Sequence, residues 1–131
     1  MVTRAMATRL ARGFTLVELL VVLAIIALLM SITLPRYFHA IDVSKEQVLA
    51  ENLRATRDAI DKFYGDTGRY PDSLDELVEK RYLRSAPVDP VTGSTTTWIV
   101  VAPDAQFQGN VYSIRSGAPG TAHDGHAFAD L

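Results

Sequence analysis

Glu18 is the residue of this chain whose surroundings make the strongest chemical demand. It is a carboxylate near the start of an apolar run that extends from Phe14 to Leu34. A charged side chain at the centre of a bilayer costs about 2.5–3.5 kcal/mol, and the cost falls toward the interface. Glu18 therefore needs a partner, which is either a donor in its own chain or a positive charge on another molecule.

The neighbouring residues offer both kinds of partner. Thr15 and Glu18 have the spacing of a capping box, in which Glu18 accepts from a free amide at the start of a helix, near the positive end of its dipole. Alternatively, cleavage between Gly13 and Phe14 creates an α-amine whose ordinary pKa is about 7.7–8.0. In a low dielectric that cation would attract Glu18 of a neighbouring subunit and fix the axial register of two helices. The residues alone leave both interpretations open.

A second candidate for chemistry is the group His123, Asp124 and His126. Two imidazoles and a carboxylate are suitable ligands for a transition metal. The glycine-rich surroundings favour a mobile tail over a metal site, so we predict no metal ligand here. No serine–histidine–aspartate arrangement, phosphate-binding glycine loop or carboxylate pair is recognisable, and we predict no catalytic residue and no enzyme.

The apolar run that carries Glu18 predicts a membrane-spanning helix. At about 1.5 Å per residue, Phe14 to Leu34 covers about 31 Å, close to the roughly 30 Å of a hydrocarbon core. The leader contains three arginines (Arg4, Arg9 and Arg12) and no acid. By the positive-inside bias the N-terminus lies in the cytoplasm, and the chain after Pro35 lies across the membrane.

Two plainer interpretations of this run are a secretory signal peptide and a passive membrane anchor. A signal peptide has an apolar region of about 7–15 residues and a small-residue cleavage site. Here the run is longer and is followed by bulky residues from Leu34 to Phe38. These features argue against a signal peptide, whereas a passive anchor remains open.

Beyond Pro35, which predicts a kink or an end in the helix, the pattern is that of an amphipathic helix from about Ile41 to Tyr64. Its apolar stripe recurs at steps of three and four residues and consists of Leu49, Leu53, Thr56, Ile60 and Phe63. We expect this stripe to pack on the chain's own sheet.

The remaining residues predict one short helix and two strands. A capping box at Ser73 opens the helix, with Leu74, Leu77 and Val78 facing inward. Residues 95–102 and 110–115 are rich in β-branched and aromatic side chains and predict two strands joined by a hairpin connection. The fold class is therefore α+β: a long N-terminal helix packed on a small antiparallel sheet.

Composition excludes several classes of protein. The chain has 131 residues, a formal net charge of −2 and no cysteine, so it has no disulfide and no thiolate site. The part after the leader is mildly acidic, which argues against nucleic acid as the primary partner.

The stretch from Arg12 to Glu18, the apolar helix behind it and Pro35 resemble the type IV pilin-like proteins, which include the pseudopilins of type II secretion. The resemblance implies that a prepilin peptidase cuts after Gly13 and methylates the new terminal Phe14. It also implies that Glu18 is the assembly residue, acting together with Phe14.

The body is similar to the major, G-type, pseudopilins. The similarity lies in residues 64–77, which include Gly68-Arg69-Tyr70-Pro71, in residues 87–90 and in residues 111–113 before a glycine-rich tail. The absence of cysteine favours this branch, because major type IV pilins commonly close their C-terminal loop with a disulfide. The implied organisation is a cleaved leader (1–13), a transmembrane and assembly helix (14–35), its amphipathic continuation (36–64) and a periplasmic globular α+β region (65–131).

The resemblance further implies a homopolymer, a helical periplasmic pseudopilus that drives protein export. Its partners would be the inner membrane, minor pseudopilins and an assembly platform with an ATPase motor. The protein would cross the bacterial inner membrane once. The alternatives are the major subunit of a type IV pilus, serving adhesion, motility or DNA uptake, and a non-polymerising membrane-anchored binding module.

G-type pseudopilins typically fold their C-terminal loop around calcium, using several aspartates and backbone carbonyls. This sequence departs from that pattern, because residues 116–118 are Ser-Gly-Ala where an acid is expected and only Asp124 and Asp130 remain in the tail. We therefore predict no cofactor, with calcium at this loop as the alternative.

Overall fold

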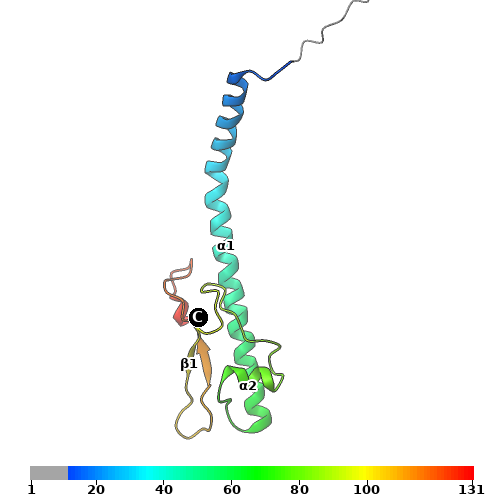
Figure 1. Cartoon of the computed structure of the whole chain (residues 1–131). Coiled ribbons are helices and arrows are strands. Elements are labelled where there is room, and N and C mark those ends of the chain that lie inside the picture. Colours follow the sequence, from blue (N-terminus) through cyan, green and yellow to red (C-terminus); the bar gives the residue numbers. More distant parts are fainter. Residues whose placement is uncertain (1–11) are drawn as a thin grey trace, which may run out of the picture. The chain divides into compact units, whose positions relative to one another are not determined.

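The computed structural model describes residues 12–131 and contains one long helix, one short helix and a two-stranded sheet (Figure 1). The predicted leader (1–13) lies outside the described residues except for Arg12 and Gly13. Helix α1 is Leu16–Thr67 and contains Pro35. The chain forms two compact units, one ending at Phe38 and one covering His39–Leu131. The expected α+β class is confirmed: the second half of α1 packs on a small antiparallel sheet.

In the first unit, the described residues 12–38 are mostly the N-terminal half of α1, and their side chains are exposed. Two hydroxyl side chains within the apolar part of α1 bond back to the helix: Ser31 Oγ donates to the Ala27 carbonyl and Thr33 Oγ1 to the Leu29 carbonyl, both at 2.9 Å. These bonds satisfy polar groups that would otherwise be costly in an apolar environment. The helix continues through Pro35, so it does not end there, and a kink at Pro35 stays a prediction.

In the second unit, the apolar stripe of α1 forms the core. All five residues of the predicted stripe are buried, with Leu49 and Ile60 at 0% exposure. The stripe packs with residues of α2 and the hairpin, among them Leu77, Val111 and Ile114. The prediction that it covers the chain's own fold is confirmed. Figure 1 shows α2 and the hairpin beside this part of α1.

Helix α1 ends at Thr67, three residues later than the predicted Tyr64. Gly68 follows with a φ of +77° and donates its amide to the Tyr64 carbonyl at 2.8 Å. A glycine in this left-handed conformation is a common helix end, because it satisfies a free carbonyl without a Cβ clash. The C-terminal boundary is therefore set by Gly68.

Helix α2, Leu74–Glu79, begins where the capping box predicted. Ser73 Oγ accepts from the Glu76 amide at 3.3 Å, and Leu77 is fully buried. The Glu76 carboxylate, however, accepts from the Asp72 amide at 2.7 Å and pairs with Arg69. These bonds hold the pKa of Glu76 below its usual value, and the hydrogen bond with Arg69 has the largest effect. Glu76 thus ties α2 to the segment after α1.

The sheet is shorter than predicted. Strand β1 is Ile99–Val101 and strand β2 is Ser113–Arg115, paired antiparallel with Val100 opposite Ile114. The amides of Asn110 and Val111 donate to the Pro71 carbonyl, at 3.1 and 3.0 Å, instead of extending the ladder. Strand propensity could not reveal this tertiary competitor for the backbone groups.

The C-terminal tail is folded, which corrects the prediction of a mobile tail. Thr121 and Ala127 form an isolated bridge, and a 3-10 helix, η1, covers Phe128–Asp130. Phe128 is buried at 9% exposure and Ser116 at 0%. Sequence reasoning gave weight to the glycines, whereas the burial of Phe128 against the domain holds the segment in place.

Gly109 is predicted to be a position where any side chain is costly. Its φ is +104°, and a Cβ there would collide with the Tyr70 carbonyl. We expect Gly109→Ala to lower the free energy of unfolding by about 2–5 kcal/mol, combining left-handed strain with overpacking. Urea unfolding of the purified chain in detergent measures this.

Gly93→Ala is the matched control for this prediction. Gly93 has a φ of +71° but open space where the Cβ would lie, so only the backbone strain of about 1–2 kcal/mol is expected. Equal losses in the two variants would contradict a collision at Tyr70.

Candidate processing and assembly site

The predicted capping box is present at the start of α1. The Thr15 amide donates to Glu18 Oε2 at 3.0 Å, and the Glu18 amide donates to Thr15 Oγ1 at 3.1 Å. Each side chain thus satisfies one free amide of the first turn. In the single chain, the Glu18 carboxylate accepts from a donor of its own chain.

The predicted cleavage junction lies just before this cap. Residues 12–15 are outside any helix or strand, and Phe14 is 93% exposed. A Cβ on Gly13 would meet no atom within 4 Å. The structure therefore places Gly13 and Phe14 on an exposed stretch of chain directly before α1, and Glu18 in the first turn of that helix.

An extensive apolar surface follows the junction. Every large apolar side chain from Leu16 to Leu34 is between 43% and 76% exposed. Within α1 an 18-residue window reaches a mean hydropathy of 2.7, and none of that window is buried. By length and composition this part of α1 can cross a membrane. A soluble chain rarely leaves so large an apolar surface uncovered.

The predicted histidine group is divided between two contacts. His123 turns to Glu46 of α1, whereas the His126 ring lies 3.1 Å from Asp124 on its own loop. Hydrogen bonds from the His126 amide and ring lower the pKa of Asp124. Within the described range 12–131, no three histidine, aspartate or glutamate side chains gather in a way that could hold a metal ion.

The oxygen donors near the tail do not fit a calcium cage, which needs six to eight oxygens. The buried carboxylate Asp89 uses Oδ2 to accept from Ser116 Oγ at 2.6 Å and Oδ1 to accept from the Val91 amide at 2.9 Å. Asp124 is bonded to His126, at 3.1 Å from its amide. The carboxylates of Asp89 and Asp124 therefore already accept hydrogen bonds from within the protein.

Among the tertiary contacts that the sequence analysis did not predict, two involve charged residues of α1 and the C-terminal part of the chain. Arg57, half-buried on α1, donates to the carbonyls of Ile114 and Leu131 at 2.9 and 2.7 Å. Glu46, also on α1, contacts His123. Both contacts join residues far apart in the chain, and no local pattern could have indicated them.

Comparison with known proteins now agrees with this arrangement. The prokaryotic N-terminal methylation motif matches residues 8–34, which include the junction and Glu18. The type II secretion system core protein G of Klebsiella michiganensis is 30% identical over 130 residues, covering 86% of this chain and 89% of that protein. The chain belongs to the type II secretion system core protein G family.

Other relatives of this G-type pseudopilin chain fit the same assignment. The core protein G of Pectobacterium carotovorum is 28% identical over 86% of this chain and 81% of that protein. The type IV major pilin PilA of Myxococcus xanthus is 38% identical over 66 residues, which are 50% of this chain and 30% of PilA. No solved structure gives a significant match. The resemblance to the type IV pilin-like proteins, and to their G-type branch, is confirmed.

Proposed function

We propose that this chain is the precursor of the structural subunit of a periplasmic pseudopilus. A prepilin peptidase cuts after Gly13 and methylates Phe14, and the mature subunits polymerise through α1. The observation that carries the proposal is the uncovered apolar half of α1, with a single carboxylate in its first turn. Lipid covers this surface in the free subunit, and identical helices cover it in the filament.

Small residues would permit the helices to approach closely. Ala24 and Ala27 lie one turn apart within the apolar segment. A head-to-tail contact that does not close gives an open helical filament instead of a ring. The new amine at Phe14 would pair with Glu18 of a neighbouring subunit, so that Glu18 exchanges its own-chain donor for a charge.

In this proposal the protein crosses the inner membrane once, with its N-terminus in the cytoplasm and the second unit in the periplasm. Subunits added at the base push the filament outward and help to export folded substrates. A partner ATPase motor, the assembly platform and minor pseudopilins complete the machine.

The similarity to PilA supports the surface type IV pilus as the second candidate. Surface filaments at native expression would favour the pilus over the pseudopilus.

Processing is tested by the intact mass and N-terminal residue of the protein purified from its native membrane. We expect the chain to start at Phe14 and to carry one additional methyl group. Gly13→Leu should retain the first thirteen residues, because the bulky side chain blocks the peptidase.

Ala11→Leu is the matched control, since it makes a similar change two residues before Gly13. It should be cut normally. A native product that keeps its leader, or a Gly13→Leu chain that is processed like the control, would contradict the proposed processing.

A further inference from the structure

The segment from Gly120 to Phe128 is a closed loop that packs on the second unit. The Ala122 amide donates to the His126 carbonyl at 2.8 Å, and the Gly125 amide donates to the Ala122 carbonyl at 3.0 Å. Ala122 and Phe128 are 8% and 9% exposed. The loop therefore covers part of the domain with its apolar side chains while its turn stays in water.

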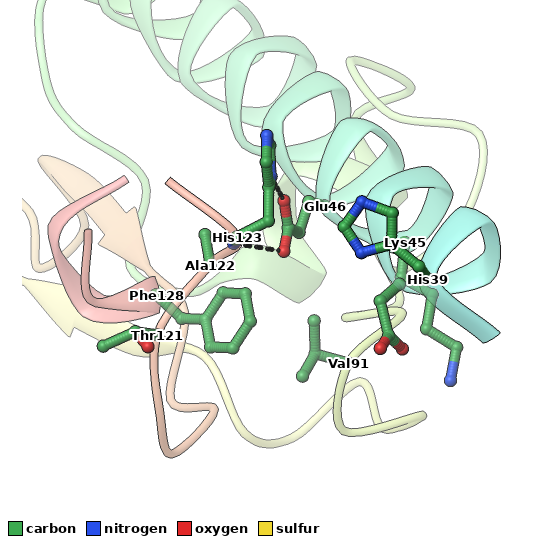
Figure 2. Close-up of a pocket in the computed structure, with 9 residues that line it drawn as sticks. His39, Lys45, Glu46, Val91, Thr121, Ala122, His123 and Phe128 are labelled. Carbon is green, nitrogen blue, oxygen red and sulfur yellow. Dashed lines mark hydrogen bonds and ion pairs between the residues drawn. The ribbon is translucent and has the colours of Figure 1, made fainter. Parts of the chain in front are cut away.

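Within residues 12–131, the hydrogen bonds between this loop and α1 are made by one residue pair, His123 and Glu46. The His123 amide donates to Glu46 Oε1 at 2.8 Å, and His123 Nδ1 contacts Glu46 Oε2, as the two dashed lines of Figure 2 show. The Glu46 side chain is only 12% exposed, whereas that of His123 is 52% exposed. Within residues 12–131, both hydrogen bonds to this shielded carboxylate come from His123.

The pair lies at a cavity of about 490 Å³ whose charged groups come from two elements (Figure 2). Helix α1 contributes His39, Asp42 and Lys45 beside Glu46. The His39 ring is edge-on to that of His123 at 6.5 Å. From the loop itself, Asp124 adds a negative charge near His123.

The residues that the other elements contribute to the cavity lining are uncharged. Val91 comes from the loop before β1, Phe128 from η1, and Thr121 and Ala122 from the C-terminal loop. The environment of His123 is therefore dominated by the Glu46 carboxylate, which raises the pKa of His123 above its ordinary value, chiefly through the hydrogen bond.

We propose that His123 and Glu46 form a pH-sensitive latch that holds the Gly120–Phe128 loop against α1. Protonated His123 pairs with Glu46 as a charge-assisted hydrogen bond, which is stronger than a neutral one. Neutral His123 keeps only the amide bond and a neutral contact. The latch is a property of the second unit and does not rest on the proposed filament.

The sign of the pH dependence follows from the raised pKa. The stabilisation is fully present below the unfolded-state pKa of histidine, about 6.5. It is lost as the pH rises through the higher pKa of folded His123. Above that pH, the loop should open more often while the α1 stripe stays closed.

Hydrogen–deuterium exchange of the full-length protein in detergent, between pH 6 and pH 8.5 and corrected for intrinsic exchange rates, tests the latch. We expect the protection of peptides that cover residues 120–128 to fall with rising pH. Peptides that cover α1 from Leu53 to Phe63 should keep the same protection across this pH range. Protection of the loop that does not change with pH would overturn the proposal.

Variants separate the latch from a general pH effect. In His123→Gln, which cannot be charged, the loop should exchange at all pH values as the wild type does at high pH. Glu46→Gln should behave in the same way, and far-UV circular dichroism checks that both variants fold. His126→Gln is the matched control in the same loop, because His126 pairs with Asp124 and not with α1. The His126→Gln variant should keep the pH dependence of the wild type. If this variant lost the pH dependence, the assignment to His123 would be overturned.

The same exchange experiment with added calcium distinguishes the latch from a cation site. Added calcium at pH 8.5 should leave the protection of residues 120–128 unchanged, because the carboxylates of Asp89 and Asp124 already accept hydrogen bonds within the protein. Restored protection would overturn the latch, since a cation would then hold the loop.

Discussion

Glu18→Val is expected to abolish filament formation while leaving the protein inserted in the membrane and its second unit folded. Valine removes a carboxylate from the apolar half of α1, so insertion becomes easier. In the proposed filament, however, it leaves the α-amine of a neighbour's Phe14 without its counter-charge. Breaking one side of a buried ion pair costs about 3–5 kcal/mol, or about 100- to 4,000-fold in the affinity between subunits.

The capping box makes this prediction harder to interpret, because Glu18 also satisfies the Thr15 amide. Two further variants separate the two roles. Glu18→Gln keeps a side-chain oxygen that can cap the helix but removes the charge. Thr15→Ala removes the hydroxyl that caps the Glu18 amide but keeps the carboxylate, at a cost of about 0.5–2 kcal/mol in helix stability.

If the charge drives assembly, Glu18→Gln should fail like Glu18→Val, and Thr15→Ala should still form filaments. Electron microscopy and sedimentation of sheared filaments measure the outcome, and membrane fractionation checks insertion. The opposite pattern, with Glu18→Gln assembling and Thr15→Ala failing, would assign Glu18 to the cap alone. A Glu18→Val chain that polymerises normally would indicate a passive role.

The elements that were predictable from sequence are those in which neighbouring residues determine the structure. The steps of three and four residues from Leu49 to Phe63 report one helix face directly, and that face is buried. The spacing of Thr15 and Glu18, and that of Ser73 and Glu76, predicted two helix starts that the structure contains. Hydrophobic periodicity and capping patterns both depend on neighbouring residues, so they can be recognised in the sequence without knowledge of tertiary contacts.

What could not be predicted depends on partners distant in sequence. The sheet is short because the Pro71 carbonyl takes two amides from the predicted second strand. The tail is ordered because Phe128 is buried and because His123 reaches Glu46, 77 positions earlier in the chain. Composition indicated a mobile glycine-rich tail, since it counts residues and is blind to such contacts.

The two interpretations of Glu18 also differ in whether they depend on neighbouring residues or on a distant partner. The cap of Glu18 is a local feature and was one of the two interpretations that the residues allowed. The proposed assembly role of Glu18 needs another copy of the chain, and it was suggested by the resemblance to the pilin-like proteins, not by a distance within one subunit. The family assignment supports that role, and the intact mass of the native protein tests the proposed cleavage after Gly13 and methylation of Phe14.

Phe63→Ala is expected to be the most damaging single change to the second unit. The Phe63 side chain is 1% exposed. Its ring meets that of Tyr82 edge-on at 5.3 Å between centroids, and the Arg69 guanidinium lies over it at 5.0 Å. Truncating a buried phenylalanine costs about 3–5 kcal/mol, from lost transfer free energy and the cavity that remains.

This loss is large because a domain of ordinary stability has only about 5–15 kcal/mol in total. For a unit of this size, about 4–8 °C of melting temperature is lost per kcal/mol, so we expect a fall of at least about 12 °C. Thermal unfolding of the full chain in detergent, followed by near-UV circular dichroism, measures it. The aromatic signal reports the packing around Tyr82 directly.

Phe38→Ala is the matched control, because it makes the same truncation on the same helix at a side chain that is 60% exposed. An exposed site of this kind should change the free energy of unfolding by no more than about 0.5 kcal/mol. If both variants melt together, the core does not depend on the Phe63 ring, and the burial of the α1 stripe is not what holds the second unit folded. If only Phe63→Ala falls, the amphipathic half of α1 is the structural centre of the second unit, while its apolar half remains available to lipid and to other subunits.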